Sequence, residues 1–399
     1  MLLDLTSDQD FFRETTSKFL DSQVPVDEVR RLRHDPAGFR PDFWRRGADL
    51  GWASLLVSED NGGGTISGSA LVDLTLIAHE FGRHAAPGPL VTTNVVAAAL
   101  SDVEGGITAA HAEVLAGLLT GDSIASWCFG ERSTICSPDD IQLTIEATDS
   151  EVVVNGVKRP VESAGQADHL LVTGRTGAGL TQVLVPTATP GVTVSPMESV
   201  DVTRRFSRVS FDNVRLPLDA VIGGVSTAAD QVERQLRIAI VAHNAEAVGA
   251  MQTAFDMTVA WAFDRYSFGR PLASYQELKH RFADMLSWLQ ASHAVNDAAA
   301  VAVDEGAPEA AELVSAAKAF IGDYGTEMLQ DCVQIHGGIG VTFEHDLHLY
   351  LRRVTLNRAM YGTPAEHRRR LADLVENRQK AIVENRQTTI VENRQENRA

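Results

Sequence analysis

The feature that most constrains this chain is a change in the spacing of its apolar residues, which occurs twice along the sequence. Between residues 124 and 222 apolar and polar residues alternate, as in Ile141, Leu143 and Ile145, and this alternation predicts β-strands with one buried face. Within this zone Asn155-Gly156 follows three valines and is a strong signal for a tight turn between strands. The middle of the chain is therefore expected to form an antiparallel β domain of roughly 100 residues.

On both sides of this zone the apolar spacing is three or four residues, which indicates helices. In the first part, Phe11, Phe12 and Phe19 follow this spacing after Thr6, a residue that can cap a helix. In the last part, three long helical patterns and a fourth after Pro364 predict an antiparallel bundle. We therefore predict an α+β chain with four parts, which are an N-terminal helical domain (1–123), a middle antiparallel β domain (124–224), a C-terminal four-helix bundle (225–372) and a repetitive tail (373–399).

The tail repeats the five residues VENRQ, which begin at Val375, Val383 and Val391, and Glu-Asn-Arg occurs once more at 396–398. A period of eight residues drifts relative to the 3.6 residues of a helical turn, so the repeats do not keep one apolar seam. We expect a duplicated extension that is frayed or weakly helical and carries no chemistry. The alternative is a tail that binds a partner.

Charge and composition argue against several classes of protein. The chain has 35 Lys and Arg against 53 Asp and Glu, a net charge of −18, whereas surfaces that bind nucleic acid or anionic lipid are usually basic. The sequence has no apolar run near the roughly 20 residues of a membrane-spanning helix and no signal peptide at its start. Cys128, Cys136 and Cys332 are too few and too scattered for a disulfide framework or a zinc site, although the first two could pair. We expect a reduced, soluble, cytoplasmic protein with no nucleic-acid or membrane partner.

Two motifs in the last part of the chain are specific. The sequence RYSFGRPL occupies residues 265–272 and is followed by Gln276, and QIHGGIG occupies residues 334–340. In this domain order, the two motifs together resemble those of the acyl-CoA dehydrogenase family of flavoproteins. Two further segments are similar to sequence signatures of the family, which are LGWASLLVSEDNGG at 50–63 and FDNVRLP at 211–217. The resemblance extends over most of the chain, from about residue 5 to residue 372.

The residues of these motifs suit a dinucleotide cofactor on chemical grounds as well. The guanidinium groups of Arg265 and Arg270 offer paired donors that match phosphate oxygens. Gly337 and Gly338 permit a close approach of the backbone and positive φ values, and the amide of Gln334 can bridge donors and acceptors. Taken singly, each motif has a simpler interpretation, which is a solvated charge near a helix end or a glycine helix cap.

The resemblance implies an FAD-dependent enzyme that removes the α-proton of an acyl-CoA thioester with a carboxylate while the β-hydride passes to the flavin. It places eight residues at the cofactor, which are Arg265, Phe268, Gln276, Gln334, Gly337, Gly338, Trp127 and Phe129. In the family the residues of the bundle reach the flavin of a neighbouring subunit. The resemblance therefore also implies a dimer or tetramer, made of identical or of paralogous subunits.

The sequence departs from the family at the general base, which must be an acid near the α-carbon of the substrate. The family usually has a Glu directly before Gly-Thr, and here Tyr361 takes that place; a phenol is a poor base at neutral pH. In relatives with the base on the first bundle helix, that position falls near Ala239, or at Leu236 or Ile240 in a shifted register, and none of these three residues is acidic. The nearest acid, Glu246, lies two turns along nearly the same face, and we predict it as the base. The alternative for Glu246 is a structural role, paired with His243 or an arginine, and Glu366 is a second candidate base.

The β domain departs from the family at both places where hydroxyl groups usually reach the flavin ring. The family loop begins with Thr-Glu-Pro, whereas this chain reads WCFGERS at 127–133, which keeps Glu131 but has Gly130 in place of the Thr. A later Trp-x-Thr or Trp-x-Ser site reads Pro160-Val-Glu162. Backbone amides would have to take the place of the missing hydroxyl groups.

Several functions fit this combination. Some actinobacterial relatives consist of two unlike subunits that share flavin sites, and this chain has the features of the subunit that supplies the Arg and Gln-x-x-Gly-Gly side but not the base. It also fits a self-sufficient dehydrogenase with an unusual base. The remaining alternatives are a catalytically silent scaffold or regulatory subunit and a flavin-dependent monooxygenase or oxidase on the same fold.

Overall fold

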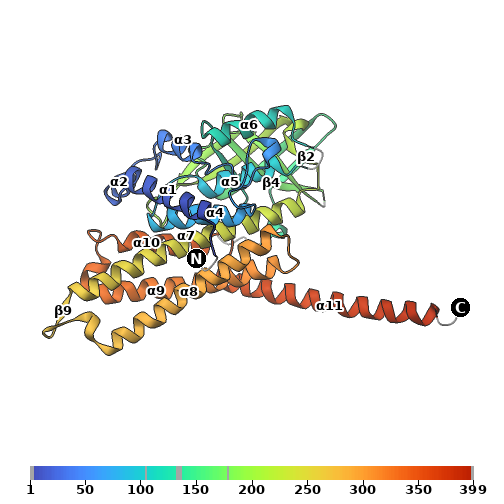
Figure 1. Cartoon of the computed structure of the whole chain (residues 1–399). Coiled ribbons are helices and arrows are strands. Elements are labelled where there is room, and N and C mark those ends of the chain that lie inside the picture. Colours follow the sequence, from blue (N-terminus) through green and yellow to red (C-terminus); the bar gives the residue numbers. More distant parts are fainter. Residues whose placement is uncertain (1–3, 104–105, 132–136, 178, 397–399) are drawn as a thin grey trace.

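A computed structural model of the chain describes residues 4–103, 106–131, 137–177 and 179–396. The N-terminal helices and the sheet lie together on one side of the molecule, and the long C-terminal helices form a separate layer next to them (Figure 1). The last helix leaves this body and projects away from it (Figure 1). The helices that precede the sheet are α1 (Ser7–Gln23), α2 (Val26–Leu32), α3 (Pro41–Asp49), α4 (Ala70–Arg83), α5 (Leu90–Ser101) and α6 (Ala109–Thr120).

Helix α1 begins where the sequence predicts. Thr6 Oγ1 accepts a hydrogen bond from the Gln9 amide at 3.2 Å, and Gln9 Oε1 accepts one from the Thr6 amide at 3.1 Å. These two bonds form a capping box, which satisfies backbone donors that the first turn of a helix leaves unpaired. Helices α4 and α5 are buried along nearly their whole lengths, as mostly apolar helices must be.

The N-terminal helices join the bundle through a close contact between α4 and α7 (Ala229–Asp264). A Cβ atom on Gly82 of α4 would come within 1.9 Å of the Glu246 carbonyl oxygen, and one on Gly249 of α7 within 2.0 Å of the His79 carbonyl oxygen. A larger residue at either glycine would push the two helices apart, because the interior is close-packed. This reciprocal contact fixes the position of Glu246 between the two helical regions.

The sheet contains β1 (Ala125–Cys128), β2 (Thr144–Ala147), β3 (Glu151–Glu162), β4 (His169–Thr176), β5 (Gly179–Pro186), β6 (Val192–Met197), β7 (Phe206–Pro217) and β8 (Val221–Ile222). The strand order is β6-β7-β3-β2-β4-β5-β8, and β1 pairs with β4. Most neighbours are antiparallel, as predicted. However, β1 and β2 run parallel to β4. Both are separated from β4 by other chain segments, which is what a parallel pair requires because a tight turn cannot connect it.

The turn predicted at Asn155-Gly156 is wrong. Strand β3 continues through both residues, and its register with β7 shifts between Val154 and Gly156, so the pair forms a β-bulge. Gly156 has a φ of 141°, and a Cβ atom there would come within 2.9 Å of the Leu143 side chain. Asn155 Oδ1 accepts a hydrogen bond from the Asn213 amide at 2.8 Å. The two residues therefore bend one strand and do not reverse the chain.

The bundle contains α7, α8 (Gln276–Asp304), α9 (Ala310–His336), α10 (Leu347–Ala359) and α11 (Pro364–Glu396). The sequence predicts all of these except α10, whose first turn has no side-chain cap and so lacks a start signal. A short hairpin of β9 (Tyr266–Ser267) and β10 (Arg270–Pro271) joins α7 to α8. This hairpin lies at the end of the bundle farthest from the sheet, which we call the bundle tip (Figure 1).

Helix α11 continues through the three VENRQ copies as far as Glu396, whereas the sequence predicts a frayed or weakly helical tail. The stretch has neither Gly nor Pro after Pro364, and its Glu, Arg, Gln and Ala residues favour helix. Arg378 of the first copy forms an ion pair with Glu312 of α9 at 3.1 Å. Asn397 and Arg398, which end the repeated sequence, lie outside the described residues. Among the described helices, none has the length and apolar character needed to cross a membrane.

Candidate functional site

The eight predicted cofactor residues fall in two groups, one beside strand β1, which pairs with β4 of the sheet, and one at the bundle tip. The sheet and the bundle tip lie far apart in one chain (Figure 1). Trp127 and Phe129 lie on and directly after β1, where the sheet meets the bundle. The other six lie at the bundle tip, on the β9–β10 hairpin, at the start of α8 and at the end of α9. The chain does not bring its own two groups together, so a site that uses both needs a second subunit.

The bundle tip presents uncovered groups to solvent. Arg265 and Arg270 are exposed, and Phe268 between them is 98% exposed with a φ of 50°. The Arg270 guanidinium lies 3.9 Å from the centre of the Tyr275 ring, a cation–π contact that orients it. Tyr275 Oη donates a hydrogen bond to the Ser267 carbonyl at 2.7 Å and holds the hairpin closed. The arginines are thus placed on a fixed hairpin with their donors available.

The glycine turn that follows α9 is equally open. Gly337 has a φ of 66°, and a Cβ atom on Gly337 or Gly338 would meet nothing within 4 Å. Gln334 and Gln276 are also exposed. Backbone without side-chain cover is what close approach by a ligand requires. By contrast, the nearby His336 is buried and donates through Nδ1 to the Cys332 carbonyl at 2.8 Å, so it packs within the bundle.

At the junction of sheet and bundle, the predicted aromatic residues stack on one another. The ring centroids of Trp127 and Phe129 are 4.6 Å apart, and those of Trp127 and Tyr361 are 5.7 Å apart. Trp127 Nε1 donates to Thr173 Oγ1 at 3.2 Å. Tyr361, which stands where the family has its base, has a φ of 55°, and burial of its hydroxyl raises its pKa above the usual value. A phenol of this kind stays protonated and is a poor base.

The loop after β1 is tied to the sheet by Glu131. Its carboxylate accepts hydrogen bonds from the amides of Gln142 and Leu143 at 2.9 and 2.8 Å and from Lys158 Nζ at 2.8 Å. Lys158 also donates to the Phe129 carbonyl at 3.1 Å, and burial lowers the pKa of this lysine. Glu131 therefore fixes the conformation of the loop through bonds to neighbouring parts of the sheet domain. Residues 132 and 133 of the same loop lie outside the described residues.

Glu246, the predicted base, belongs to a buried cluster around Arg204. Arg204 Nη1 donates to Glu246 Oε2 at 2.9 Å, and Arg204 Nε donates to Glu162 Oε1 at 2.7 Å. Asn357 Oδ1 accepts from Arg204 Nη1 at 3.0 Å, and Asn357 Nδ2 donates to Glu246 Oε2 at 3.2 Å. All four side chains are buried. This arrangement matches the structural alternative for Glu246, a pairing with an arginine.

His243 completes the cluster and connects the two places where the family carries a base. Its Nδ1 lies 2.7 Å from the Ala239 carbonyl and its Nε2 lies 2.8 Å from Arg204 Nη2, so a proton on Nδ1 satisfies both contacts. The His243 ring also packs 5.4 Å from that of Tyr361. Burial alone would raise the pKa of Glu162, but the neighbouring charge of Arg204 holds it at about 2. Glu162 is therefore an ionised partner of Arg204.

Sequence reasoning missed Arg204 and Asn357. Arg204 follows β6 in a loop with no motif, and Asn357 lies on α10, the helix that the sequence does not predict. The one available signal was Glu162, a carboxylate among buried residues of a strand, because a buried charge requires a partner. Glu366, the second candidate base, accepts hydrogen bonds from Thr363 N and Oγ1 at 2.7 Å each. It caps the start of α11.

A cavity of about 500 Å³ lies between the sheet and α10. Its lining is mostly apolar and includes Pro160 and Phe206 from the sheet side and Leu356, Ala359 and Met360 from the α10 side. Pro160 lies in one of the two places that the resemblance assigns to the flavin ring, and Ala359 and Met360 directly precede Tyr361 at the family's base position, so the cavity fits a flat apolar ring beside that position. Neither Glu162 nor Glu246 contributes to the lining. Among the described residues, no group of three or more His, Cys, Asp or Glu side chains is arranged to hold a metal ion.

Comparisons with known proteins match both helical regions. The family profile described as acyl-CoA dehydrogenase, N-terminal domain, matches residues 6–122, and that described as acyl-CoA dehydrogenase, C-terminal domain, matches residues 229–375. The chain is 27% identical over 368 residues to acyl-CoA dehydrogenase IpdE2 of Mycolicibacterium smegmatis, an alignment that covers 92% of this chain and 98% of that relative.

Solved structures share the fold. A variant of the Tcur3481-Tcur3483 steroid ACAD superimposes with a TM-score of 0.82 at 23% identity, covering 92% of this chain and 98% of that one. PigA with FAD and proline superimposes with a TM-score of 0.85 at 21% identity, covering 95% of this chain and all of that one (100%). At these identities the likeness is one of architecture.

Proposed function

Because the chain belongs to the acyl-CoA dehydrogenase family, an oxidoreductase family of FAD-binding flavoproteins, we propose that it is one half of a heteromeric acyl-CoA dehydrogenase. In this assembly the bundle tip of the chain completes a flavin site on an unlike subunit. That unlike subunit supplies the general base. The substrate is an acyl-CoA thioester, from which the assembly removes the α-proton and the β-hydride.

One observation carries the proposal, which is that both acids near the base positions are committed to Arg204. A general base must direct a carboxylate oxygen at the substrate proton. Glu246 and Glu162 instead form ion pairs with Arg204 at 2.9 and 2.5 Å in a buried cluster. The opposite charges hold this cluster together. Turning either carboxylate toward a substrate would leave the buried Arg204 charge without that partner.

The space beside the base positions is also taken. Ala239 and Tyr361 are the two positions from which the family would reach the substrate α-carbon. The His243 side chain contacts both, by its hydrogen bond to the Ala239 carbonyl and its packing against the Tyr361 ring. An acyl chain would have to displace this histidine and with it the Arg204 cluster. This chain is therefore unsuited to bind substrate for its own chemistry.

The bundle tip has the opposite character and supports a role at another subunit's flavin. Arg265 and Arg270 would bind phosphate oxygens, and the Gly337–Gly338 turn leaves room for a close backbone contact. When bound, the flavin supplies the acceptor for the substrate hydride. The apolar cavity beside Pro160 and Met360 is where this chain would itself hold a flavin ring. The Tcur3481-Tcur3483 steroid ACAD, which is named for two components, has the same fold and supports an assembly of unlike subunits.

The test compares the chain alone with the chain co-expressed with an unlike subunit of the same family. Visible absorption reports flavin content, and anaerobic bleaching after addition of acyl-CoA reports dehydrogenation. We expect no bleaching by the chain alone and bleaching by the complex.

The competing function is a self-sufficient dehydrogenase with Glu246 as its base, and Glu246→Gln separates the two. Under our proposal this substitution leaves bleaching by the complex unchanged. Bleaching by the chain alone that Glu246→Gln abolishes, with flavin content retained, would establish the competing function. Glu366→Gln is the matched control, because it changes the same group at the cap of α11.

A further inference from the structure

Two adjoining hollows lie where α1, α4, α7 and α8 meet, in a part of the molecule that the function above does not use. The outer hollow holds about 450 Å³ and is lined by residues of all four helices. The inner hollow holds about 10 Å³, the space of about one water molecule. His79 of α4 and His293 of α8 line both hollows, which we together call the α4–α8 pocket. Its lining includes neither the predicted cofactor residues nor the side chains bonded to Arg204.

The inner wall of the α4–α8 pocket carries polar atoms that form no hydrogen bond within the described part of the chain. These atoms are His79 Nε2, Glu80 Oε2 and Asn296 Oδ1. Their residues are 8%, 2% and 3% exposed, so bulk water does not cover them. A buried acceptor that lacks a donor destabilises the folded chain, and three such acceptors at one pocket indicate a bound group that donates hydrogen bonds.

Neighbouring contacts identify these atoms as acceptors. His79 Nδ1 lies 3.4 Å from Glu80 Oε1, so the ring proton belongs on Nδ1 and Nε2 keeps its lone pair. Asn296 Nδ2 donates to the Val241 carbonyl at 3.2 Å, which identifies Oδ1 as the unbonded end of the amide. Burial lowers the pKa of His79, and it lowers the pKa of His293 to about 3, so both rings are neutral. Burial alone would raise the pKa of Glu80, but the hydrogen bond from His79 lowers it, so this carboxylate is charged.

The pocket also has a surplus of negative charge. Its charged side chains are four acids and two arginines, which are Glu14, Glu80, Asp256, Asp297, Arg13 and Arg83. Arg13 pairs with Asp10 at 3.0 Å, and Glu14 pairs with Lys18 at 2.8 Å. Counting these two partners leaves the surplus of two negative charges unchanged. The lining therefore favours a cation.

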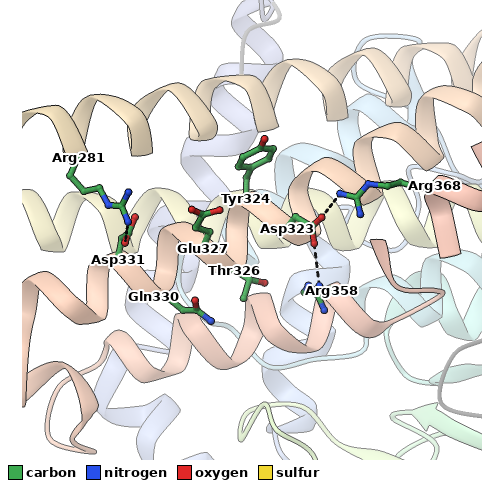
Figure 2. A pocket seen from close by; sticks show the side chains of 9 residues that line it. All are labelled: Arg281, Asp323, Tyr324, Thr326, Glu327, Gln330, Asp331, Arg358 and Arg368. Carbon is green, nitrogen blue, oxygen red and sulfur yellow. Dashed lines mark hydrogen bonds and ion pairs between the residues drawn. The ribbon is translucent and has the colours of Figure 1, made fainter. Parts of the chain in front are cut away.

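The larger groove along α9, which holds about 790 Å³, lacks this character. Asp331 pairs with Arg281 at 2.6 Å, and Asp323 pairs with both Arg358 and Arg368 (Figure 2). The three acids that line this groove are balanced by its three arginines. It therefore has no surplus charge to attract a ligand.

We propose that the α4–α8 pocket binds the ammonium group of a small primary amine, beside His79 where the two hollows adjoin. An ammonium group has three N–H donors and no acceptor, which matches a wall of unbonded acceptors. Its positive charge matches the Glu80 carboxylate and the negative surplus. The inner hollow is of the size of this head group, and the outer hollow accommodates the organic part of the ligand. An anion would find neither a free donor at the inner wall nor a favourable charge.

Calorimetric titration of the full chain with three probes tests this proposal. The probes are n-butylammonium, tetramethylammonium, which has the charge but no N–H group, and n-butanol, which has one donor but no charge. We expect n-butylammonium to bind once per chain and about tenfold or more tighter than the other two, because only it makes charge-assisted hydrogen bonds. No binding of n-butylammonium, or equal binding of all three probes, overturns the proposal and assigns the acceptors to water alone.

Variants locate the bound amine. Glu80→Gln keeps the shape of the side chain and removes its charge, and Asn296→Leu removes an acceptor. Each should weaken n-butylammonium binding about tenfold. Glu59→Gln, which makes the same change at an exposed residue, is the matched control and should bind like the wild-type chain. Circular dichroism confirms that each variant is folded, and unchanged affinity in a folded Glu80→Gln variant overturns the proposal.

These measurements need neither flavin nor an unlike subunit, because the α4–α8 pocket and the bundle tip consist of different residues. Amine binding by the chain alone would therefore persist if the proposed function failed. A chain that completes the flavin site of another subunit but binds no amine would overturn this inference alone.

Discussion

At the junction of sheet and bundle, the Arg204 guanidinium is buried and bonds to Glu162, Glu246, Asn357 and His243. At the bundle tip, Arg265 and Arg270 are exposed, and the only partner that the structure describes for their guanidinium groups is the ring of Tyr275. The two regions thus use arginine in opposite ways. Arg204 is buried and bonds to its neighbours, whereas Arg265 and Arg270 keep their N–H donors exposed to solvent.

The difference bears on where a reaction can occur. A guanidinium has five N–H donors, and those that already bond to buried carboxylates are not available to a ligand. The same holds for the carboxylates, whose value as bases depends on being free to accept a substrate proton. A family resemblance assigns functional residues to both regions. Of the charged groups in the two regions, those of the bundle tip remain free to bind a ligand, which is why we assign the tip of this chain to the flavin site of another subunit.

The largest expected effect follows from removing the buried arginine. Arg204→Met leaves Glu162 and Glu246 as two buried carboxylates without their shared cation. Breaking a buried ion pair in this way costs about 3–5 kcal/mol of unfolding free energy. Urea denaturation followed by circular dichroism measures the change.

Arg265→Met at the bundle tip is the matched control for this substitution. An exposed arginine without an ion pair should change the unfolding free energy by less than about 0.5 kcal/mol. The triple variant Arg204→Met, Glu162→Gln, Glu246→Gln should recover much of the loss, because it removes the uncompensated charges as well. Equal losses for Arg204→Met and Arg265→Met would contradict the distinction between a closed and an open region.

At the bundle tip we expect a smaller effect, which changes flavin binding and leaves the unfolding free energy almost unchanged. Arg265→Ala in the complex should weaken flavin binding roughly ten- to hundredfold, which corresponds to the loss of one charge-assisted hydrogen bond. Its unfolding free energy should stay near that of the wild-type chain. Flavin affinity is measured by fluorescence as the cofactor is titrated into the apo-complex. Arg175→Ala, on the sheet and away from the tip, serves as the control, and a similar loss in that variant would argue against a role for the tip.

Much of the fold could be predicted because its signals are local. The alternation of residues 124–222 and the helical spacing on either side reflect which face of each element is buried, and that pattern is present in the sequence itself. The errors occur where a local signal has two outcomes. Asn155-Gly156 permits either a turn or a bulge, and its pairing with β7 decides in favour of the bulge. Helix α10 has no capping side chain, so only its packing reveals it.

The candidate site was less predictable because its decisive contacts are long-range. Nothing near Glu246 in the sequence indicates Arg204, which is 42 residues away, or Asn357, which is 111 residues away. The departure from the family at Tyr361 could be recognised from the sequence, but its consequence depends on what fills the space around it.

The effect with the smallest step per pH unit concerns a second buried cation, Lys318, behind the junction. Lys318 of α9 is buried and donates through Nζ to the Asn357 carbonyl, so it supports the residue whose side chain bonds to Arg204 and Glu246. Unlike Arg204, it has no carboxylate partner in the described part of the chain. Burial, together with the nearby Arg358 charge, lowers the pKa of Lys318 to about 7.

The sign of the pH dependence follows from this shift. Above pH 7 the folded chain holds Lys318 neutral while the unfolded chain still binds a proton there. The unfolding free energy should therefore rise with pH from about 7 toward the unfolded pKa of about 10.4, by about 1.4 kcal/mol per pH unit once Lys318 is neutral in the folded chain. Below pH 7 both states carry the proton, and this contribution is constant. Lys318→Met should remove the rise, whereas Lys279→Met on α8, which is exposed, should keep it. Urea denaturation between pH 6 and pH 9 compares the three proteins, and parallel curves for wild type and Lys318→Met would show that the buried lysine does not titrate in this range.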